Sequence, residues 1–368
     1  MFELTIKKND LLPPLLTVAG AVDRKQSLAI LSNILLKLND NTLLLTATDL
    51  EIEISATIPC QATESSGAIT VPAKKFVDII RSLDDEATPK LSVSDKAVTL
   101  KEGRSQFKLA MLSADSYPSS EDEVSDLELS ISRSDLLHLF QATQFAMSQQ
   151  DVRVFLNGLL LEIDERHLTT VATDGHRMAI CKLPCEAGNQ QHKLIIPRKG
   201  IQEISRLLST VTDEQVTLSA GKNHLKVQTS QYTFVSKLIE ARFPPYIKAI
   251  PKEQDKSVVI SRDVLKRALS RIVILANEKS RAILLHLQEG QLTLIAHNQD
   301  QEEAMESIEA KTEGGELKIG INAGYLQDVL GYVDAGDIKL SMSTPDSSVL
   351  VETVTDEHYQ YIIMPMKI

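Results

Sequence analysis

Hydrophobic and polar residues follow each other along the chain in blocks that switch between the spacing of a strand and that of a helix. The first block predicts a strand at Phe2–Ile6 and an apolar helix from about Asn9 to Val22. If Asp10 caps this helix, Pro13 falls in the first turn, where proline is tolerated, and Pro14 distorts the helix. Three alternating stretches then predict strands at Ile34–Leu38, Leu43–Thr48 and Ile52–Ile58, with a turn at Asn39-Asp40-Asn41. The order is a βαβββ unit.

The same unit follows a second time. Ala68–Val71 predicts a strand, and Lys74–Leu83 predicts an amphipathic helix. Its apolar face is expected to hold Phe76, Ile79, Ile80 and Leu83. Three more strands are predicted at Leu91–Val93, Ala97–Leu100 and Phe107–Met111. Two βαβββ units therefore make one domain of the α+β class.

This whole domain recurs about every 125 residues. Ala47-Thr48-Asp49 returns as Ala172-Thr173-Asp174 and again as Ala296-His297-Asn298. A period this long exceeds the roughly 20–50 residues of solenoid repeats, so each copy is a domain. The segments Ser113–Asp126, which is acidic and serine-rich, and Arg242–Asp255, which carries three prolines, are expected linkers. The predicted domains are 1–125, 126–252 and 253–368.

The later copies supply the remaining helices of a total of six. They are predicted at Ser134–Met147, capped by Ser132 or Ser134, at Lys199–Leu208, at Arg262–Ala276, capped by Ser261, and at Ala323–Val333, capped by Asn322. Three similar domains in one chain indicate a curved or ring-like assembly. The surface that they form together then matters more than any single pocket.

Composition places the chain in the cytoplasm and indicates no cofactor or metal. The sequence has 43% hydrophobic residues, enough for a core in each domain, and neither a leader segment nor an apolar run near 18 residues. Cys60, Cys181 and Cys185 are odd in number and complete no four-ligand set, so they are expected to be reduced thiols.

A net charge of -11 argues against nucleic acid for the chain as a whole, but the surface that faces a partner decides. Cations gather at the starts and polar faces of the six helices: Lys7, Lys8, Lys74, Lys75, Arg81, Arg133, Arg198, Lys199, Arg206, Arg262, Lys266, Arg267 and Arg271. Acidic clusters lie elsewhere, at Asp84–Glu86, Glu121–Glu123 and Gln299–Glu306. A solvated helix face is the plain alternative. If all six helices face one side, that side binds phosphates without reading sequence.

Catalysis has one candidate, the segment Thr173–Arg177, in which Asp174 and His176 suggest acid–base chemistry or a metal site. Gly175 between them favours a turn, and the other copies lack the histidine. The chain has none of the nucleophile, zinc-protease or nucleotide-binding motifs. We therefore predict no catalytic residue and a binding role for this loop.

Several long strings, in order, make the chain resemble the beta subunits of bacterial DNA polymerase III. They are TDLEIE (Thr48–Glu53), VPAKKF (Val71–Phe76), ATQFAMSQQDVRVFLNG (Ala142–Gly158), VATDGHRMA (Val171–Ala179), IIPRKG (Ile195–Gly200), SKLIEARFPPY (Ser236–Tyr246), NEK (Asn277–Lys279) and YIIMPMKI (Tyr361–Ile368). The resemblance covers essentially the whole chain. It implies a non-catalytic sliding clamp: a head-to-tail homodimer whose six domains close a ring around duplex DNA.

The resemblance also implies partners and a site for them. The polymerase III alpha subunit, the clamp loader, other polymerases and repair proteins would insert short peptides into an apolar pocket between the second and third domains. Carried over by motif, that pocket comprises Leu156, Thr173, Gly175, His176, Arg177, Met178, Pro244, Lys248, Asn322, Tyr325, Ser348, Ile362, Ile363, Met364, Pro365 and Met366. Met178, Lys248 and Ser280 depart from the residues common in the family and bear on peptide preference. Without the resemblance, the terminal MPM would be taken for the last core strand.

Two further sets of residues follow from the resemblance. Those expected at DNA are Arg24, Lys25, Lys74, Gln150, Arg153, Phe155, Arg198 and Lys199. Those expected at the dimer interface are Lys74, Lys75, Arg104, Phe107, Lys108 and Leu109 on one chain, and Ile274, Leu275, Glu302, Glu303 and Glu306 on the other. Two alternatives remain, a triplicated scaffold that binds proteins without DNA and an enzyme that uses Asp174 and His176.

Overall fold

The computed structural model describes residues 2–22, 28–94, 97–118, 125–187, 191–333, 336–355 and 358–367. Contacts divide the chain into two compact units, Met1–Ser134 with Gln202–Leu238 and Asp135–Ile201 with Ile239–Ile368. Helices accompany antiparallel sheets in both units, which confirms the predicted α+β class. The domain boundaries near residues 125 and 252 stay a prediction. Arg24 and Lys25, expected at DNA, lie outside the described residues.

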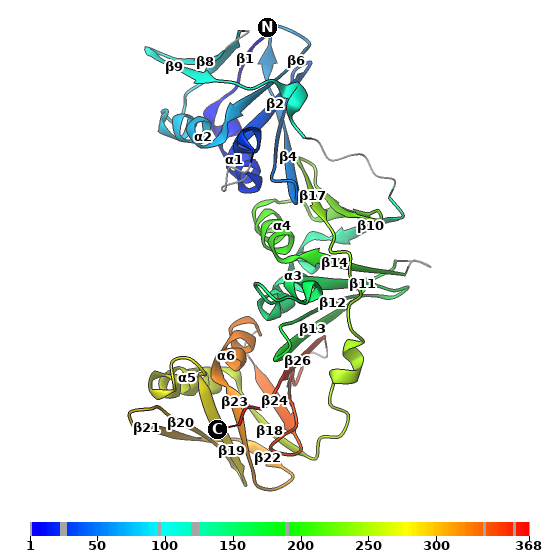
Figure 1. Ribbon diagram of the computed structural model, residues 1–368, viewed down its shortest axis with the longest axis vertical. Helices are drawn as coiled ribbons and strands as arrows, with labels where there is room; N and C mark the ends of the chain where they lie inside the picture. The colour runs from blue at the N-terminus through cyan, green and yellow to red at the C-terminus, as the bar shows by residue number, and fades with distance from the viewer. Residues whose placement is uncertain are drawn as a thin grey trace. The chain divides into compact units, whose positions relative to one another are not determined.

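Each third of the chain holds two βαβββ units in succession (Figure 1). The first third contains β1 (Glu3–Thr5), α1 (Lys8–Val18), β2 (Asn33–Asn39), β3 (Thr42–Thr48) and β4 (Ile52–Pro59), then β6 (Ser66–Pro72), α2 (Ala73–Ser82), β7 (Lys90–Val93), β8 (Ala97–Glu102) and β9 (Ser105–Ala110). The short strand β5 (Gln61–Ala62) lies between its two halves. Asp40 has a φ of +50°, which confirms the predicted turn between β2 and β3.

The other two thirds repeat this order. The second contains β10 (Leu127–Ser132), α3 (Arg133–Thr143), β11 (Gly158–Ile163), β12 (His167–Thr173) and β13 (Arg177–Pro184), then β14 (His192–Pro197), α4 (Arg198–Thr210), β15 (Gln215–Ala220), β16 (His224–Gln228) and β17 (Tyr232–Lys237). The third contains β18 (Lys256–Ser261), α5 (Arg262–Ile272), β19 (Ala282–Gln288), β20 (Gln291–His297), β21 (Glu303–Glu309) and the short β22 (Lys311–Glu313), then β23 (Leu317–Asn322), α6 (Ala323–Tyr332), β24 (Asp337–Met342), β25 (Val349–Thr353) and β26 (Tyr359–Ile363). The doubled unit and its six α-helices are thus confirmed in the described part of the chain.

Two long sheets form where strands from successive thirds pair. In the first unit the order is β10-β15-β16-β17-β4-β3-β2-β6, and in the second it is β14-β11-β12-β13-β26-β25-β24-β18-β22. The joining pairs are β4 with β17, in which Ile52 lies opposite Ser236, and β13 with β26, in which Arg177 lies opposite Ile363. The two remaining sheets have the orders β5-β1-β7-β8-β9 and β21-β20-β19-β23.

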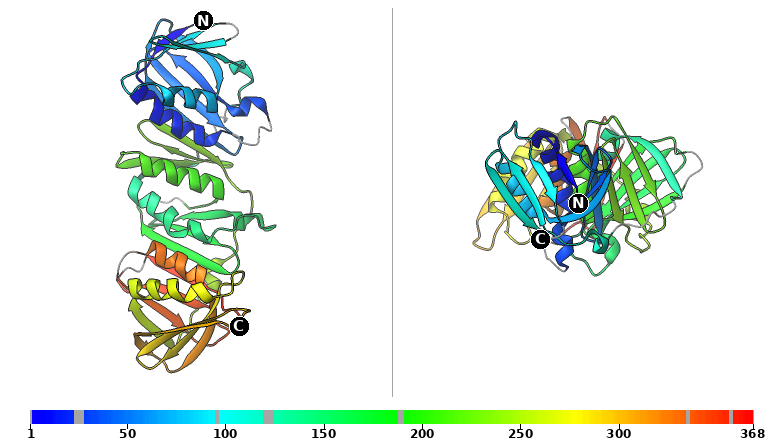
Figure 2. Two further views of the ribbon diagram at one scale, coloured as in Figure 1. Left: turned by 90° about the vertical axis from the view of Figure 1, so that its left-hand side faces the viewer. Right: turned by 90° about the horizontal axis from the view of Figure 1, so that it is seen from above.

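The helices cover these sheets in pairs. Figure 2 shows α1 beside α2 and α5 beside α6. Each helix buries one apolar stripe, as Leu11, Leu15 and Val18 do on α1. On α2 the buried face contains Phe76, Val77 and Ile80. The sequence predicted Ile79 on this face instead of Val77, but Ile79 is only half-buried.

Helix ends differ from prediction at one place and agree at another. Asp10 is not the cap of α1, since the helix begins at Lys8 with Lys7 at the N-cap. Pro13 and Pro14 therefore lie inside the helix rather than in its first turn. Asn322 does cap α6, and its side-chain oxygen accepts hydrogen bonds from two backbone N–H groups. Ser261 occupies the N-cap of α5 without such a bond.

Candidate functional site

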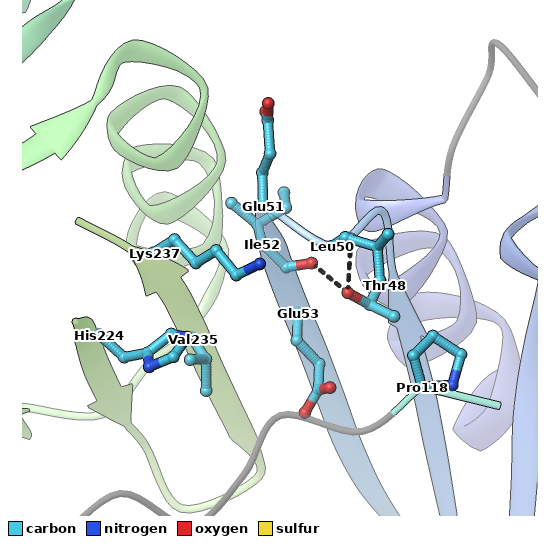
Figure 3. A pocket seen from close by; sticks show the side chains of 9 residues that line it. All are labelled: Thr48, Leu50, Glu51, Ile52, Glu53, Pro118, His224, Val235 and Lys237. Atoms are coloured by element: carbon cyan, nitrogen blue, oxygen red, sulfur yellow. Dashed lines mark hydrogen bonds between the residues drawn. The ribbon is translucent and has the colours of Figure 1, made fainter. Parts of the chain in front are cut away.

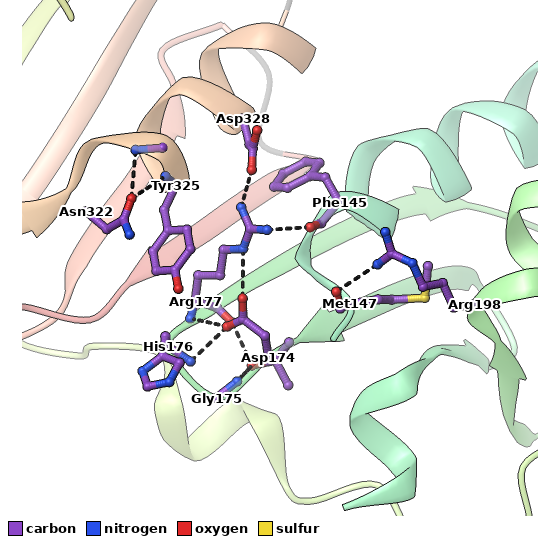
Figure 4. Close-up of polar contacts among 12 residues, drawn as sticks. Phe145, Met147, Asp174, Gly175, His176, Arg177, Arg198, Asn322, Tyr325 and Asp328 are labelled. Carbon is purple, nitrogen blue, oxygen red and sulfur yellow. Dashed lines mark hydrogen bonds and ion pairs between the residues drawn. The ribbon is translucent and has the colours of Figure 1, made fainter. Parts of the chain in front are cut away.

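Residues Thr173–Arg177 form a tight turn between β12 and β13 (Figure 4). The Asp174 carboxylate accepts hydrogen bonds from the backbone N–H of His176 at 2.9 Å and of Arg177 at 3.0 Å. The Thr173 hydroxyl donates to the Arg177 carbonyl at 2.6 Å and accepts from the Gly175 N–H at 3.1 Å. Gly175 has a φ of +89°, which confirms the turn predicted there. The carboxylate of Asp174 is thus committed to shaping the loop.

The Arg177 side chain crosses from this turn to the third repeat (Figure 4). Its Nε donates to Asp174 at 3.1 Å, one Nη donates to Asp328 on α6, and the other donates to the Phe145 carbonyl at 2.6 Å. The guanidinium also lies 4.6 Å from the ring centre of Tyr325 and 5.6 Å from that of Phe145. Only 13% of the Arg177 side chain is exposed. The turn and the start of α6 are therefore held together.

Tyr325 and Asn322 enter the site from the first turn of α6. The Asn322 side-chain oxygen accepts from the N–H of Gly324 at 2.8 Å and of Tyr325 at 3.4 Å, while its amide donates to the Ser280 carbonyl at 3.1 Å. Burial and the neighbouring Asp174 raise the pKa of Tyr325, and Arg177 opposes that shift. Tyr325 therefore keeps its proton at neutral pH, and the helix cap holds its backbone N–H.

The chain's end forms the opposite wall of the site. Ile362 and Ile363 lie in β26 with their side chains buried, as a last core strand requires. The strand stops at Met364, whose N–H donates to the His176 carbonyl at 2.9 Å and whose side chain is 46% exposed. Met366 N–H donates to the Gly320 carbonyl at 2.8 Å. The core-strand interpretation is therefore confirmed for Ile362 and Ile363, and the pocket role of the tail stays a prediction.

The floor of the site is a hydrophobic cluster of buried side chains. Met178 and Ile362 belong to it, together with Leu160, Val171, Ile180, Ile195 and Leu350. Phe155, Phe243 and Tyr246 pack against this cluster, and the Phe155 and Phe243 rings meet edge to face with centres 6.1 Å apart. An apolar floor below exposed polar groups is the usual form of a ligand pocket.

The sixteen residues predicted for the peptide site fall into three classes of exposure. Four are buried, namely Leu156, Met178, Ile362 and Ile363. Eight are half-buried, namely Thr173, Gly175, Arg177, Asn322, Tyr325, Ser348, Pro365 and Met366. Four are exposed, namely His176, Pro244, Lys248 and Met364. Sequence reasoning missed Phe145 and Asp328, which hold Arg177.

Pro244 also lines a second hollow in the same unit. A pocket of about 520 Å³ is enclosed by Leu160, Lys193 and Ile195 together with the segment from Ala241 to Ile247. That segment is held in place by Tyr246, whose hydroxyl donates to Glu162 at 2.8 Å. Burial and the adjacent Glu162 raise the pKa of Tyr246, so it too remains a donor.

The residues predicted at DNA have varied surroundings. Lys74 and Gln150 are exposed. Arg153 donates from Nε and Nη to Asp151, each at 3.0 Å, and a Cβ on Gly175 would lie 3.1 Å from its guanidinium. Arg198 is half-buried and donates to the Met147 carbonyl at 2.9 Å, and burial lowers its pKa. Lys199 is also half-buried.

Two of the helix cations are not free for phosphates. Lys8 is only 6% exposed and pairs with Asp85 at 3.0 Å. Arg133 donates to the backbone carbonyls of Leu208 at 2.8 Å and Asp213 at 2.9 Å. These two cations are therefore engaged within the protein, and the basic face inferred from the helices stays a prediction.

Several residues predicted at a dimer interface lie on or beside β9 and β21, two strands that end their sheets. Phe107, Lys108 and Leu109 belong to β9, with Lys108 exposed and Leu109 buried, and Arg104 precedes the strand. Glu303 and Glu306 belong to β21, and Glu302 directly precedes it. Glu306 pairs within the chain with Arg271, which lowers the pKa of the carboxylate. Ile274 is 76% exposed, Leu275 is half-buried, and Lys75 is exposed on α2.

The first unit contains a turn of the same design (Figure 3). Asp49 accepts from the backbone N–H of Glu51 and of Ile52, both at 2.9 Å. The Thr48 hydroxyl donates to the Ile52 carbonyl at 2.8 Å and accepts from the Leu50 N–H at 3.0 Å. A pocket of about 90 Å³ lies beside this turn and is lined by Thr48, Leu50, Glu51, Ile52, Glu53, Pro118, His224, Val235 and Lys237.

In the described part of the chain there is neither a metal-binding cluster nor a membrane-spanning helix. Among the residues that the structure describes, no group of three or more His, Cys, Asp or Glu side chains is placed to hold a metal ion. Over the same residues, every helix is too short or too polar to cross a membrane. Asp174, half of the suspected acid–base pair, bonds to the loop backbone and to Arg177 instead.

Three domain families match the chain in succession. The N-terminal domain of the DNA polymerase III beta subunit matches residues 2–121, the central domain residues 130–245, and the C-terminal domain residues 247–367. The chain therefore belongs to the family of DNA polymerase III beta subunits, the beta sliding clamps, which act in DNA replication.

Its relatives bear this out over the whole length. The beta sliding clamp of Pseudomonas aeruginosa is 42% identical over 365 residues, which is 99% of each chain. That of Escherichia coli K12 is 38% identical over 366 residues, all of both chains. A crystal structure of the P. aeruginosa clamp bound to griselimycin superposes with a TM-score of 0.96 at 41% identity, and the beta subunit of Caulobacter crescentus with 0.94 at 32%, each over all of both chains.

Proposed function

We propose that this chain forms a head-to-tail homodimer that closes as a ring around duplex DNA. The ring tethers the replicative polymerase without any chemical step of its own, and it acts in the cytoplasm. Three domains, 1–125, 126–252 and 253–368, would make half of the ring. The proposal rests on family membership and on one regularity in the strand pairing.

That regularity is the observation that carries the proposal. The last strand of one repeat's first half pairs with the last strand of the next repeat's second half, as β4 does with β17 and β13 with β26. By this rule β21 of the third repeat needs the equivalent of β9 from a first repeat. Both β9 and β21 end their sheets within the described residues. Since one chain supplies only three repeats, β21 would pair with β9 of a second copy, which makes the contact head-to-tail.

The charges on the two strands suit such pairing. Carrying over the register of β4 with β17 places Glu303 opposite Lys108 of the partner chain and Glu302 opposite Leu109. Opposite charges directly across a strand pair stabilise it, and like charges destabilise it. Ile274 and Leu275 would add apolar contact with Phe107, while Lys74, Lys75 and Arg104 would face Glu306. Two such contacts close a six-domain ring.

DNA would pass through the ring with contacts to phosphates only. Arg24, Lys25, Lys74, Gln150, Arg153, Phe155, Arg198 and Lys199 remain the proposed contact residues. Contacts of this kind are sequence-independent and weaken steeply with salt, which suits a protein that must slide. The topological link, rather than these contacts, would hold the ring on DNA.

Partner proteins would bind at the turn Thr173–Arg177 and the tail. We propose that short peptides of the polymerase III alpha subunit, the clamp loader, other polymerases and repair proteins insert an apolar anchor over Met178 and Ile362, between His176, Tyr325 and Met364. A methionine wall adapts to anchors of different shape, and a few anchors carry most of the affinity in such grooves. We also expect griselimycin, which the P. aeruginosa clamp binds, to bind this chain.

Light scattering tests the ring directly. The wild-type chain at micromolar concentration is expected to have twice the mass of one chain, and Ile274→Ala with Leu275→Ala is expected to be a monomer. Loading onto nicked circular duplex follows, and the wild-type protein should stay bound until the circle is cut. A monomeric wild-type protein would contradict the ring proposal. A dimer that binds proteins but does not stay on circular DNA would favour the alternative, a scaffold that binds proteins without DNA.

A further inference from the structure

The side chain of Arg177 is held in place by contacts within its own protein. Each of its three guanidinium nitrogens donates a hydrogen bond, to Asp174, to Asp328 and to the Phe145 carbonyl. Its flat face lies against the Tyr325 ring at 4.6 Å. An arginine held in this way shapes a site by fixing its neighbours. Three of its five N–H donors are used in this way, so the position of the guanidinium is set within the protein.

The turn does not need an arginine. In the first unit the same hydrogen bonds form with Ile52 in the place of Arg177, since Asp49 and Thr48 bond to the backbone as Asp174 and Thr173 do. The backbone turn is thus made by the Thr-Asp pair alone. Whatever Arg177 contributes lies in what it touches beyond the turn.

The first unit has a related carboxylate–guanidinium contact that does not involve its turn. Glu203 on α4 is 125 residues before Asp328 and occupies the equivalent place on its helix. Glu203 accepts from Arg206 of the same helix at 2.8 Å, and Arg206 donates to the Thr17 carbonyl of α1 at 3.1 Å. In each unit an acid on the later helix, Glu203 or Asp328, bonds to an arginine. That arginine in turn donates to a backbone carbonyl near the end of an earlier helix, Thr17 in the first unit and Phe145 in the second. Such a contact alone would be structural.

The second unit differs because its guanidinium comes from the turn and stacks on Tyr325. We propose that Asp328 is a positioning residue for the peptide site, which holds Arg177 and through it the Tyr325 ring and the His176 backbone in their binding geometry. This inference rests on the proposed function. Asp328 itself stays at the margin, since its side chain is 48% exposed.

The expected effect of losing Asp328 is moderate and specific. A half-exposed ion pair stabilises a protein little, and Arg177 keeps Asp174 and the Phe145 carbonyl. Folding should therefore be nearly unchanged, while the stack with Tyr325 loosens. By the usual range for exposed pairs, Asp328→Asn should weaken peptide binding about two- to five-fold.

The experiment measures peptide affinity by fluorescence anisotropy. Overlapping 15-residue peptides covering the polymerase III alpha subunit of the same cell are first scanned against the wild-type dimer, and the tightest binder becomes the probe. Asp328→Asn is compared with Glu203→Gln, which removes the equivalent carboxylate in the first unit. Asp328→Glu should restore affinity to within about two-fold of wild type, because a glutamate serves at the equivalent position.

Salt supplies a readout that a merely structural role would not move. Salt screens an exposed ion pair, so raising it should bring wild-type affinity toward that of Asp328→Asn, whose own affinity should change less. Equal affinity of Asp328→Asn and wild type, or an equal loss in Glu203→Gln, would overturn the inference. If no alpha-subunit peptide binds the wild-type chain, the proposed peptide site itself fails.

Discussion

The turns Thr48–Ile52 and Thr173–Arg177 have the same backbone and different side chains. Both are closed by a threonine hydroxyl and an aspartate carboxylate with matching bonds. Both also receive the strand that follows them in space, since Lys237 N–H donates to the Glu51 carbonyl and Met364 N–H to the His176 carbonyl, each at 2.9 Å. The repeat therefore conserves a framework of main-chain bonds within this one chain.

The side chains on that framework have diverged. Where the second turn has Gly175, Met178 and Met364, the first has Leu50, Glu53 and Lys237. Beside the turn Thr48–Ile52 lies a pocket of about 90 Å³ flanked by charges, whereas the turn Thr173–Arg177 lies beside an apolar cluster. The shared main-chain bonds therefore form the turn in both units, and the side chains around it determine which partner can bind.

Exchanging Met178 and Glu53 should have the largest effect. Met178→Glu places a carboxylate in the buried cluster, which should cost about 3 kcal/mol or more. Glu53→Met, on a half-buried side chain, should change stability by less than about 0.5 kcal/mol. Urea denaturation of both variants, with hydrogen exchange to assign the unit affected, measures the difference. Equal losses would mean that the two sites are alike in polarity.

Removing the aspartates should follow in size. Asp49→Ala loses two backbone bonds and should cost about 1–2 kcal/mol, while Asp174→Ala also frees Arg177 and should cost about 2–3 kcal/mol. Only Asp174→Ala should lower peptide affinity, by more than about tenfold. The asparagine variants, which keep one acceptor oxygen, serve as controls for stability. A loss of peptide affinity in Asp49→Ala would show that the first turn also affects peptide binding, contrary to the prediction.

Adding a methyl group at Gly175 should have a smaller effect. Gly175→Ala puts a side chain at a φ of +89° and 3.1 Å from the Arg153 guanidinium, and the strain should cost about 1 kcal/mol. Gly103→Ala is the matched control, because its φ is +53° and a Cβ there would meet nothing within 4 Å. Both should melt earlier by a similar amount. Peptide affinity should fall in Gly175→Ala alone.

The turns and helix caps could be predicted from the sequence, but the side-chain contacts between distant parts of the chain could not. The turn at Gly175 and the cap at Asn322 follow from local preferences of glycine and asparagine, and both are confirmed. Asp328 was missed because an exposed acid on a helix has no local signature, and its partner Arg177 is 151 residues away. One signal was present, since Glu203 and Asp328 are acids at equivalent places in two repeats.

Helix α1 shows the opposite kind of failure. A local rule placed Asp10 at the cap, yet tertiary contacts start the helix at Lys8, whose backbone N–H donates to the Ala87 carbonyl at 2.8 Å and whose amine pairs with Asp85. Two prolines are then accommodated inside the helix. Propensity is a weak prior that packing overrides. The capping rule held at Asn322, whose side chain bonds to the backbone of its own helix, and failed at Asp10, where contacts of Lys8 set the start of the helix.

The smallest effect concerns the loop that lies over Gly175 in the second turn. Asp151 accepts from Arg153, whose hydrogen bonds lower the pKa of this carboxyl from 3.8 to about 2. A carboxylate with a lowered pKa stabilises the folded state fully above the unfolded value and loses that contribution as the pH falls through the folded one. The contribution of Asp151 should therefore be complete above about pH 4 and disappear near pH 2.

Carbon-detected NMR of the Asp151 carboxyl measures this titration. The wild-type midpoint should lie near 2, and Arg153→Gln should move it upward toward 3.8, because the charged hydrogen bonds are lost. The Asp255 carboxyl, whose pKa is lowered by its hydrogen bond from Lys256, is the internal reference and should titrate at the same pH in both proteins. An unchanged Asp151 midpoint in Arg153→Gln would show that Asp151 does not fix the guanidinium over Gly175. The loop would then not belong to the difference between the two turns.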